Sequence, residues 1–365
     1  MPINVLLISN YRNYVSFRPE VSIFIGLDKL GFKGHIMTYT ECSHIPEIQE
    51  SGINLVNFHP SKKYDKGEIK RIRDFIIEEK IDVLQLVNSR SIVNGIAAAK
   101  GLPVKVVLYR GYVGNIHWYD PTAYLKFLHP RVDKIFCNSK GVQEEINRQL
   151  FFDKSKTVAI HKGHNVAWYE KYEPYDIRSE LGLSPDTFLV INVANNRKMK
   201  GIPYLLQAFN DLPNDLPIHL LLVGENMDDA PNMKAINKGG KKDKIHILGF
   251  RDNILNIVAA CNVFASASIK GESTTKSLIE AMSLEIAPIV TNIPGNRDLA
   301  VHEESGLMIE RKNSFQLKEA MLRLYNDQEF TKQLGKNAKQ RIISHFNSEQ
   351  TVVEVAEFYK SLVSK

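Results

Sequence analysis

Glu272 and Glu280 flank a short polar stretch whose residue types could bind a phosphorylated ligand. The stretch follows the apolar run Val263–Ser266, which predicts a buried strand. A helix is expected to begin near Thr274 or the threonine after it, with Ser273 or Thr274 as its N-cap. Free backbone N–H groups at the start of a helix suit a diphosphate. At the helical rise per residue the two carboxylates lie on the order of 10 Å apart. That span suits a nucleotide sugar, with one carboxylate at the sugar hydroxyls and the other at the ribose hydroxyls.

Alone, this pair of glutamates is a weak signal. A Glu-x7-Glu spacing occurs roughly once by chance in a chain of this size. Glu280 could instead pair with Lys276, which lies one helical turn before it. Ser273 and Thr274 could be helix caps and nothing more. The elements around the pair must therefore decide its meaning.

Motifs for other chemistries are absent from the chain. There is no Gly-x-Gly-x-x-Gly, no Gly-x4-Gly-Lys-Ser/Thr, no His-Glu-x-x-His and no Gly-x-Ser-x-Gly. No Asp-x-Asp occurs, so no metal site for a diphosphate is expected. The neighbouring His161 and His164 follow a predicted strand and are interpreted as structural. We expect neither a metal nor a cofactor.

Short apolar runs alternate with longer amphipathic runs, the pattern of βα units around parallel sheets. In the first half the predicted strands are Val5–Ser9, Lys33–Tyr39, Asn54–Phe58, Val83–Val87, Val104–Tyr109, Lys134–Asn138 and Thr157–His161. In the second half they are Phe188–Val193, His219–Val223, Ile245–Leu248, Val263–Ser266 and Ala287–Val290. The chain is therefore expected to be an α/β protein.

A polar stretch without a strand pattern, Trp168–Pro185, divides the chain. We expect residues 1–167, completed by a C-terminal helix over 349–365, to form one Rossmann-like, doubly wound domain. Residues 168–348 are expected to form a second. Ligands of open α/β sheets bind at the carboxyl ends of the strands, which predicts a deep cleft between the two domains.

Composition points to a globular protein with an uneven charge. The chain has 365 residues, 44% of them hydrophobic, and no apolar run of the roughly 18 residues that cross a bilayer. The N-terminus does not resemble a signal peptide, and three cysteines without close spacing fit a reducing cytoplasm. Residues 1–170 carry 23 Lys and Arg against 17 Asp and Glu, whereas the rest carries 24 against 24. This excess favours either a phosphate-bearing or anionic membrane partner or ordinary solvated helix faces. A nucleic-acid partner is not expected, because aromatic residues do not alternate with the basic ones.

Across almost the whole chain the sequence resembles the retaining glycosyltransferases of family 4, which have the GT-B fold, and the similarity is clearest in the second half. The segment Val193-Ala-Asn-Asn-Arg197-Lys-Met-Lys200-Gly201 is similar to a basic loop that contacts the donor diphosphate, and the Glu272/Glu280 pair matches the family's Glu-x7-Glu. The resemblance implies catalytic roles for Arg197, Lys200 and Glu272, and places Glu280, Ser273 and Thr274 at the donor.

Further matches follow in the family's order. His219-Leu-Leu-Leu-Val-Gly224 resembles a donor-domain strand and turn, and Ile247-Leu-Gly249-Phe250 resembles the segment that holds the nucleobase. The resemblance thus places Gly224, Gly249 and Phe250 at the donor. Pro294-Gly-Asn-Arg-Asp298 and Ser305-Gly-Leu307 are similar to elements further downstream.

The first half departs from the family. Many members have Gly-Gly in the first βα loop, where this chain has Ser16-Phe-Arg18-Pro, so Arg18 becomes a candidate donor ligand. Arg110 follows a predicted strand where members often carry a His, and is expected to face the cleft and bind or stabilise negative charge. Many members also carry an Arg where this chain has Asn195, and a carboxylate where it has Asn165.

The resemblance implies metal-independent transfer of a hexose-type sugar, with retention of configuration, from a UDP- or GDP-sugar. The expected acceptor is a saccharide or lipid-linked glycan of the cell envelope, reached in the cytoplasm or at the cytoplasmic face of the membrane. Two other functions fit the sequence: a non-catalytic sugar-nucleotide-binding subunit, and a sugar-nucleotide epimerase or phosphorylase on the same fold.

Overall fold

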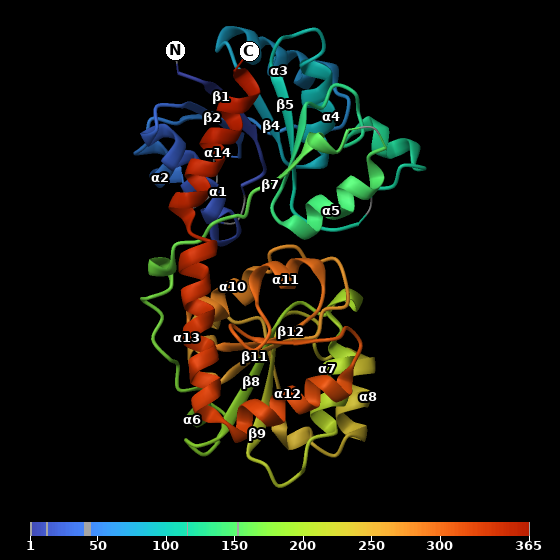
Figure 1. Cartoon of the computed structure of the whole chain (residues 1–365), viewed down its shortest axis with the longest axis vertical. Coiled ribbons are helices and arrows are strands. Elements are labelled where there is room, and N and C mark those ends of the chain that lie inside the picture. Colours follow the sequence, from blue (N-terminus) through green and yellow to red (C-terminus); the bar gives the residue numbers. More distant parts are fainter. Residues whose placement is uncertain (1, 12–13, 40–44, 115, 152, 365) are drawn as a thin grey trace. The chain divides into compact units, whose positions relative to one another are not determined.

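The chain forms two compact α/β units in a computed structural model (Figure 1). The structure describes residues 2–11, 14–39, 45–114, 116–151 and 153–364, and only the backbone of 14–16, 45 and 46. Unit 1 comprises residues 1–164 and 346–365, and unit 2 comprises residues 165–345. The sequence had suggested divisions after residues 167 and 348. Among the described residues, no helix combines the length and the apolar character needed to cross a bilayer.

Unit 1 is built on a seven-stranded parallel sheet in the order β3-β2-β1-β4-β5-β6-β7. Its strands are β1 (Asn4–Ile8), β2 (Lys33–Thr38), β3 (Asn54–Asn57), β4 (Val83–Leu86), β5 (Lys105–Arg110), β6 (Lys134–Cys137) and β7 (Thr157–Ala159). Its helices are α1 (Tyr14–Lys29), α2 (Ile45–Gln49), α3 (Lys66–Glu78), α4 (Ser89–Ala98), α5 (Lys140–Gln149) and α14 (Ser348–Val363), with 3-10 turns η1 (Pro121–Leu125) and η2 (Lys154–Lys156).

Both faces of this sheet are buried, as its continuous apolar strands require. Side chains alternate across a strand. Val5 and Leu7 of β1 therefore join one hydrophobic cluster, whereas Leu6 and Ile8 join the cluster on the other face.

The C-terminal helix α14 belongs to unit 1, where it runs beside α1 (Figure 1). The two helices approach closely at Gly26, because a Cβ there would lie 2.4 Å from Cγ2 of Val352. At the other end of α14, the Tyr359 hydroxyl donates a 2.5 Å hydrogen bond to Oε1 of Gln85 in β4. The end of the chain thus covers a sheet whose strands come from its first half.

Unit 2 is built on a six-stranded parallel sheet in the order β10-β9-β8-β11-β12-β13. Its strands are β8 (Phe188–Val193), β9 (Ile218–Val223), β10 (Ile245–Gly249), β11 (Val263–Ser266), β12 (Ala287–Thr291) and β13 (Leu307–Ile309). Its helices are α6 (Ile177–Glu180), α7 (Ile202–Asn210), α8 (Ala230–Lys238), α9 (Ile254–Ala259), α10 (Lys276–Ser283), α11 (Pro294–Leu299), α12 (Ser314–Asn326) and α13 (Gln328–His345), with η3 (Val166–Trp168), η4 (Lys198–Lys200) and η5 (Lys242–Lys244).

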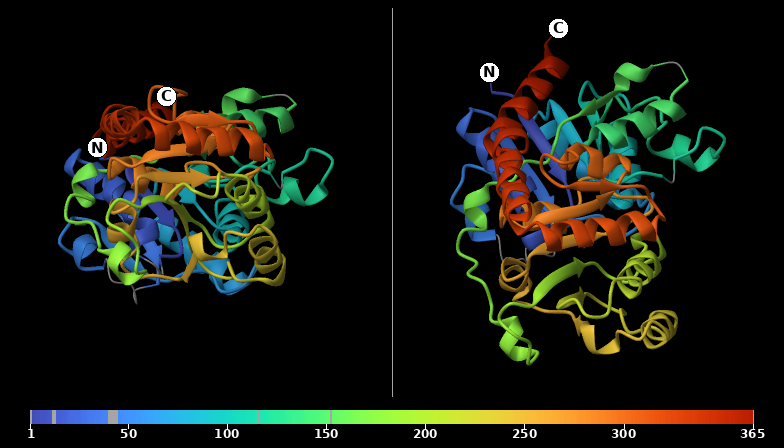
Figure 2. Two further views of the ribbon diagram at one scale, coloured as in Figure 1. Left: turned by 90° about the horizontal axis from the view of Figure 1, so that it is seen from below. Right: turned by 60° about the horizontal axis from the view of Figure 1, so that its bottom comes forward.

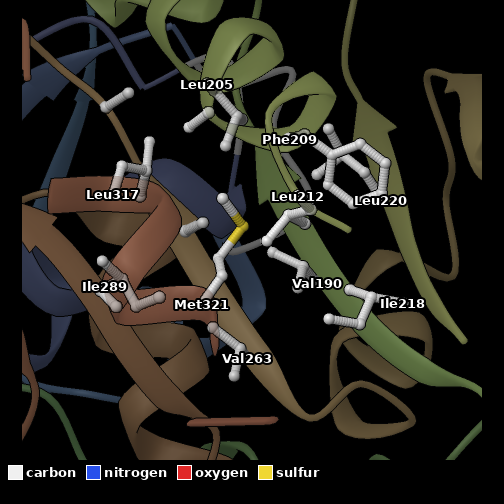
Figure 3. Close-up of a cluster of buried hydrophobic side chains, with 14 of the residues drawn as sticks. Val190, Leu205, Phe209, Leu212, Ile218, Leu220, Val263, Ile289, Leu317 and Met321 are labelled. Carbon is white, nitrogen blue, oxygen red and sulfur yellow. The ribbon is translucent and has the colours of Figure 1, made fainter. Parts of the chain in front are cut away.

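One face of this second sheet packs against α7 and α12. Figure 3 shows Met321 of α12 among side chains of both helices and of the strands, close to Leu317 and Val190. Leu205 and Phe209 of α7 are fully buried in the same cluster. This packing supports the strands whose carboxyl ends carry the candidate site.

Candidate active site

The central strands of unit 2, β8 and β11, lie side by side although β9 and β10 separate them in sequence. From β8 the chain builds outward to one edge of the sheet, and from β11 it builds to the other. The loops that leave these two strands lie at the carboxyl ends of the strands, where ligands of open α/β sheets bind. The first loop carries Arg197 and Lys200, and the second carries Glu272.

Backbone contacts hold the two loops against each other. The Ile269 N–H donates a 2.8 Å hydrogen bond to the Met199 carbonyl. Gly201 has a left-handed φ of 68°, and a Cβ there would lie 2.0 Å from the Ala267 carbonyl oxygen. Only glycine allows this approach, which places the residue before it, Lys200, next to the second loop.

Lys200 and Glu272 form an ion pair across the two loops. The Glu272 carboxylate also accepts hydrogen bonds from the hydroxyls of Ser268, at 3.1 Å to Oε1, and Thr275, at 3.3 Å to Oε2. The two charged side chains are 20% and 11% exposed. The structure thus brings together two predicted catalytic residues, and adds two hydroxyl groups that the sequence analysis had not assigned to Glu272.

The helix after the second loop begins later than predicted. Its first residue is Lys276 and its N-cap is Thr275, not Ser273 or Thr274. The Thr275 hydroxyl binds Glu272 and makes no capping hydrogen bond. The side-chain preference for N-caps could not show this, because the glutamate competes for the hydroxyl.

Glu280 lies on the same helix, α10, and is buried beside Lys276. The Lys276 ammonium is 2.8 Å from Glu280 Oε1, so the pairing that the sequence left open does occur. Burial raises the pKa of Glu280, and Lys276 acts in the opposite direction. In this structure each glutamate of the motif is therefore paired with a lysine.

Arg197 lies exposed at the start of η4, and its side chain makes no hydrogen bond or ion pair with the residues that the structure describes. Asn195 stands at the position where many family members carry the arginine, and its side chain is hydrogen-bonded to Glu225. Its Nδ2 donates to Glu225 at 3.1 Å, and its Oδ1 accepts from the Glu225 N–H at 3.2 Å. Asn195 thus ties the loop after β8 to the loop after β9.

The turns after β9 and β10 adjoin the same loop. Gly224 donates a 2.8 Å backbone hydrogen bond to Gly249, and a Cβ on Gly224 would lie 2.0 Å from the Ala194 carbonyl oxygen. Phe250, which follows Gly249, is 72% exposed. The resemblance implies that the backbone of this segment holds the nucleobase, and a contact of Gly249 or Phe250 with the donor stays a prediction.

In unit 1, Arg110 differs from its prediction. It ends β5, as expected, but its side chain is only 3% exposed, whereas the prediction had the guanidinium facing a cleft where it could bind negative charge. Its Nε donates to the Tyr112 carbonyl at 2.9 Å, and Nη2 donates to the Gly114 carbonyl. The guanidinium also lies over the rings of Tyr112, at 3.4 Å, and Phe127, at 5.0 Å. Arg110 therefore secures the loop that follows β5.

Residues Phe17 and Arg18 lie in helix α1, and not in a loop. Pro19 falls in the second turn of this helix, so the segment that the resemblance placed in the first βα loop is helical. Arg18 is half-buried, and its contact with a donor remains a prediction.

Sequence analysis missed a buried ion pair in unit 1. Lys162 Nζ is 2.6 Å from Glu20 Oε1 and 5.3 Å from the centre of the Tyr109 ring, beside a small cavity. Burial alone would lower the pKa of Lys162, but Glu20 and Tyr109 raise it above its usual value. No sequence signal joins residues 142 positions apart.

Within the described part of the chain, no three His, Cys, Asp or Glu side chains gather as metal ligands. Cys137 and Cys261 are buried free thiols, and burial raises the pKa of each to about 12. Cys42 lies outside the described residues.

Comparisons with known proteins define the class of this fold. A glycosyltransferase from Rickettsia africae ESF-5 of known structure matches with a TM-score of 0.83 at 18% identity, over 100% of this chain and 99% of the other. The model of glycosyl transferases group 1 matches residues 175–341, and that of glycosyltransferase family 4 matches residues 23–168. The chain therefore belongs to the group 1, family 4 glycosyltransferases with the GT-B fold.

Two similar proteins differ in what their names say they act on. An N-acetyl-alpha-D-glucosaminyl L-malate synthase of Bacillus anthracis is 25% identical over 52% of this chain and 50% of its own length. A UDP-Gal:alpha-D-GlcNAc-diphosphoundecaprenol alpha-1,3-galactosyltransferase of Escherichia coli is 27% identical over 63% of this chain and 60% of its own. The matches thus span half to three fifths of the length of these relatives.

Proposed function

We propose that this protein is a retaining glycosyltransferase that moves a hexose-type sugar from a nucleoside-diphosphate sugar to a cell-envelope saccharide. The observation that carries the proposal is the Lys200–Glu272 pair at the switch point of unit 2. It places a cation and a carboxylate together at the start of α10. A nucleotide sugar needs this combination, because its diphosphate is anionic and its sugar is rich in hydroxyl groups.

Each residue has a distinct part in the proposed reaction. The bond between the anomeric carbon and the diphosphate oxygen breaks, and a bond from that carbon to an acceptor oxygen forms on the same face. The proton of the acceptor hydroxyl passes to an oxygen of the departing diphosphate. Lys200, Arg197 and the N-terminus of α10 stabilise the charge on the departing diphosphate. Glu272 binds hydroxyls of the transferred sugar, and Glu280 binds those of the ribose.

Donor binding then exchanges ion-pair partners. In this structure Lys200 neutralises Glu272 and Lys276 neutralises Glu280. A diphosphate that attracts the ammonium groups frees the carboxylates to accept hydrogen bonds from hydroxyls. The lysines thus supply charged partners for two largely buried carboxylates.

We propose a UDP- or GDP-sugar as donor and a lipid-linked saccharide as acceptor, met at the cytoplasmic face of the membrane. The E. coli relative, whose name includes both UDP-Gal and diphosphoundecaprenol, supports this choice. A non-catalytic sugar-nucleotide-binding subunit is the second candidate, since Arg110, the candidate acceptor ligand, is buried and donates to the Tyr112 carbonyl. Slow donor hydrolysis by the purified protein would distinguish the enzyme from this alternative.

A nucleoside-diphosphate panel tests the donor site. We expect UDP or GDP, but not ADP, to stabilise the protein against heat, because a ligand at about 100 times its Kd adds roughly 2.7 kcal/mol to the free energy of unfolding. Glu280→Ala should lose most of this shift, since ribose contacts act mainly on affinity. Glu329→Ala, which removes an exposed glutamate paired with Lys332 at 2.8 Å, is the matched control and should keep it. An undiminished shift in Glu280→Ala would remove Glu280 from the ribose site.

Metal dependence gives a second test. We expect transfer to continue in EDTA, because Lys200, Arg197 and the α10 N-terminus supply the positive charge that a metal ion would otherwise bring to the diphosphate. The measurement is the initial rate of donor consumption with EDTA, and again after addition of Mg²⁺ or Mn²⁺. Complete loss that Mn²⁺ restores would contradict the proposal.

A further inference from the structure

The first residues of unit 2 carry charged groups that the proposed mechanism does not use. Residues 169–176 have no regular structure and lead from η3 to the short helix α6, as the light-green segment in the right view of Figure 2 shows. Two hydrogen bonds join this segment to α9. The Tyr175 N–H donates to the Asn256 carbonyl at 3.0 Å, and Asn256 Nδ2 donates to the Glu173 carbonyl at 2.8 Å. The segment therefore lies against the part of the chain that follows β10.

Helix α6 is anchored to the rest of unit 2 by Arg178. Its guanidinium donates to the carbonyls of Thr187 and Ala260, at 3.0 and 2.8 Å, and to Asn262 Oδ1, at 3.1 Å. These acceptors directly precede the two central strands, β8 and β11. Ile177 of the same helix is fully buried. Because polar and apolar contacts both hold α6, it is a fixed support for the side chains it carries.

Glu180, the last residue of α6, binds Arg251, the second residue after β10. Nη1 and Nη2 of Arg251 donate to the two carboxylate oxygens at 2.7 and 3.0 Å, which makes the ion pair bidentate. Arg251 Nε donates to Asn253 Oδ1 at 3.2 Å, and the guanidinium carbon lies 5.9 Å from the centre of the Tyr175 ring. Arg251 and the Tyr175 hydroxyl lower the pKa of Glu180 to about 2, so the pair is charged at neutral pH. We call Tyr175, Glu180 and Arg251 the turn clamp.

The backbone holds the same turn on its other side. The Gly224 N–H donates to the Gly249 carbonyl at 2.8 Å, and Gly249 has a left-handed φ of 64°. Between this attachment and the turn clamp lies Phe250, which is 72% exposed. The backbone of residues 249–251 is thus fixed at both ends although the side chain in the middle is exposed.

A fixed stretch of backbone can discriminate between nucleobases. Each peptide group offers one N–H donor and one carbonyl acceptor, and the bases differ in where their own donors and acceptors lie. A turn held in one position pairs with one such pattern and leaves polar groups unpaired against another, which costs affinity. A turn that could shift would accept several bases.

We propose that the turn clamp determines which nucleobase the donor site accepts, by holding the backbone of residues 249–251 in one position. Its three side chains act through the turn, as positioning residues. The inference rests on the proposed function, in which the donor is a nucleoside-diphosphate sugar, and on the resemblance that places the nucleobase at this turn.

The test is isothermal titration of the full chain with UDP, GDP and ADP, and with inorganic pyrophosphate as a probe that has no base. We expect the wild type to bind one nucleoside diphosphate at least about tenfold more tightly than the least favoured of the three. Glu180→Ala should weaken binding of the preferred one about tenfold, the value of one or two neutral hydrogen bonds, and lower the selectivity equally. Its affinity for pyrophosphate should stay within about twofold of the wild type, because the lost surface charge is screened by salt.

Glu303→Ala is the matched control, because it breaks an exposed ion pair with Arg323 in the same unit. It should leave all four affinities unchanged. The double variant Glu180→Arg with Arg251→Glu exchanges the two charges and should regain most of the selectivity that Glu180→Ala loses. Glu180 is partly exposed, so thermal melts are expected to show that these variants fold.

Each outcome decides for or against the turn clamp. Unchanged selectivity in folded Glu180→Ala overturns the proposal. Equal weakening of nucleoside diphosphate and pyrophosphate also overturns it, since the whole site would then have changed. A wild type that binds UDP, GDP and ADP equally tightly contradicts the clamp but leaves the proposed function standing. A wild type that binds none of the three removes the proposed function and the clamp together.

Discussion

Lys200→Ala is expected to reduce turnover at saturating donor by about 10²–10³-fold, the loss seen when one preorganised donor to a developing negative charge is removed. Negative charge grows on the diphosphate as the glycosidic bond breaks, so the ammonium stabilises the transition state more than the bound donor. The effect should therefore appear in kcat. Steady-state kinetics over a range of donor concentrations provide the measurement.

Lys198→Ala is the matched control for this variant. Lys198 lies in the same 3-10 turn, η4, but is exposed. Its removal changes the net charge equally and should leave kcat within about twofold, since exposed charges act weakly. Because Lys200→Ala also leaves Glu272 without its ion-pair partner, a thermal melt must show that the variant is folded. Normal turnover in folded Lys200→Ala would show that Lys200 does not stabilise the charge on the departing diphosphate.

The sequence predicted the fold well because each strand is a continuous apolar run between amphipathic helices. Every strand predicted in the second half was found, with small shifts at the ends. The strand β13 (Leu307–Ile309) was missed, since three residues are too few for a periodic pattern and it forms by pairing with β12. Helix α14 was predicted as a helix, but its place beside α1 depends on contacts such as Val352 against Gly26, which no local pattern reveals.

The candidate site was predicted where the chemistry is local and missed where it depends on contacts distant in sequence. The pairing of Lys200 with Glu272 follows from the strand order and from Gly201, and the family pattern had already placed both residues in the donor site. Arg110 was placed correctly at the end of β5. The burial of its guanidinium, however, depends on the following loop, whose Tyr112 and Gly114 carbonyls accept its hydrogen bonds. No pattern in the sequence indicated the ion pair of Glu20 with Lys162.

Gly295 packs closely against the backbone of the loop that carries Glu272. A Cβ on Gly295 would lie 1.8 Å from the carbonyl oxygen of Ser273 and 2.4 Å from its carbonyl carbon. These are backbone atoms, which cannot rotate aside as a side chain can. Nearby, the Thr291 hydroxyl donates a 2.5 Å hydrogen bond to the Ser268 carbonyl, and Asn296 Nδ2 donates to the Thr291 carbonyl at 3.0 Å. The first turn of α11 and the last residue of β12 therefore fix the position of the second loop.

Gly295→Ala is accordingly expected to displace this loop from Lys200 and to abolish most of the thermal shift given by the preferred nucleoside diphosphate. The steric cost to folding should be about 1–3 kcal/mol, as for other overpacked sites, so the variant should remain folded at room temperature. Urea denaturation measures that cost, and isothermal titration measures the nucleotide affinity. Gly240→Ala separates the two effects. Gly240 has a φ of 71° with nothing within 4 Å of a Cβ, so alanine there costs about 1–2 kcal/mol through backbone strain alone, away from the site. If Gly295→Ala lost stability but bound nucleotide as tightly as Gly240→Ala, the Gly295 contact would not hold the donor loop in place.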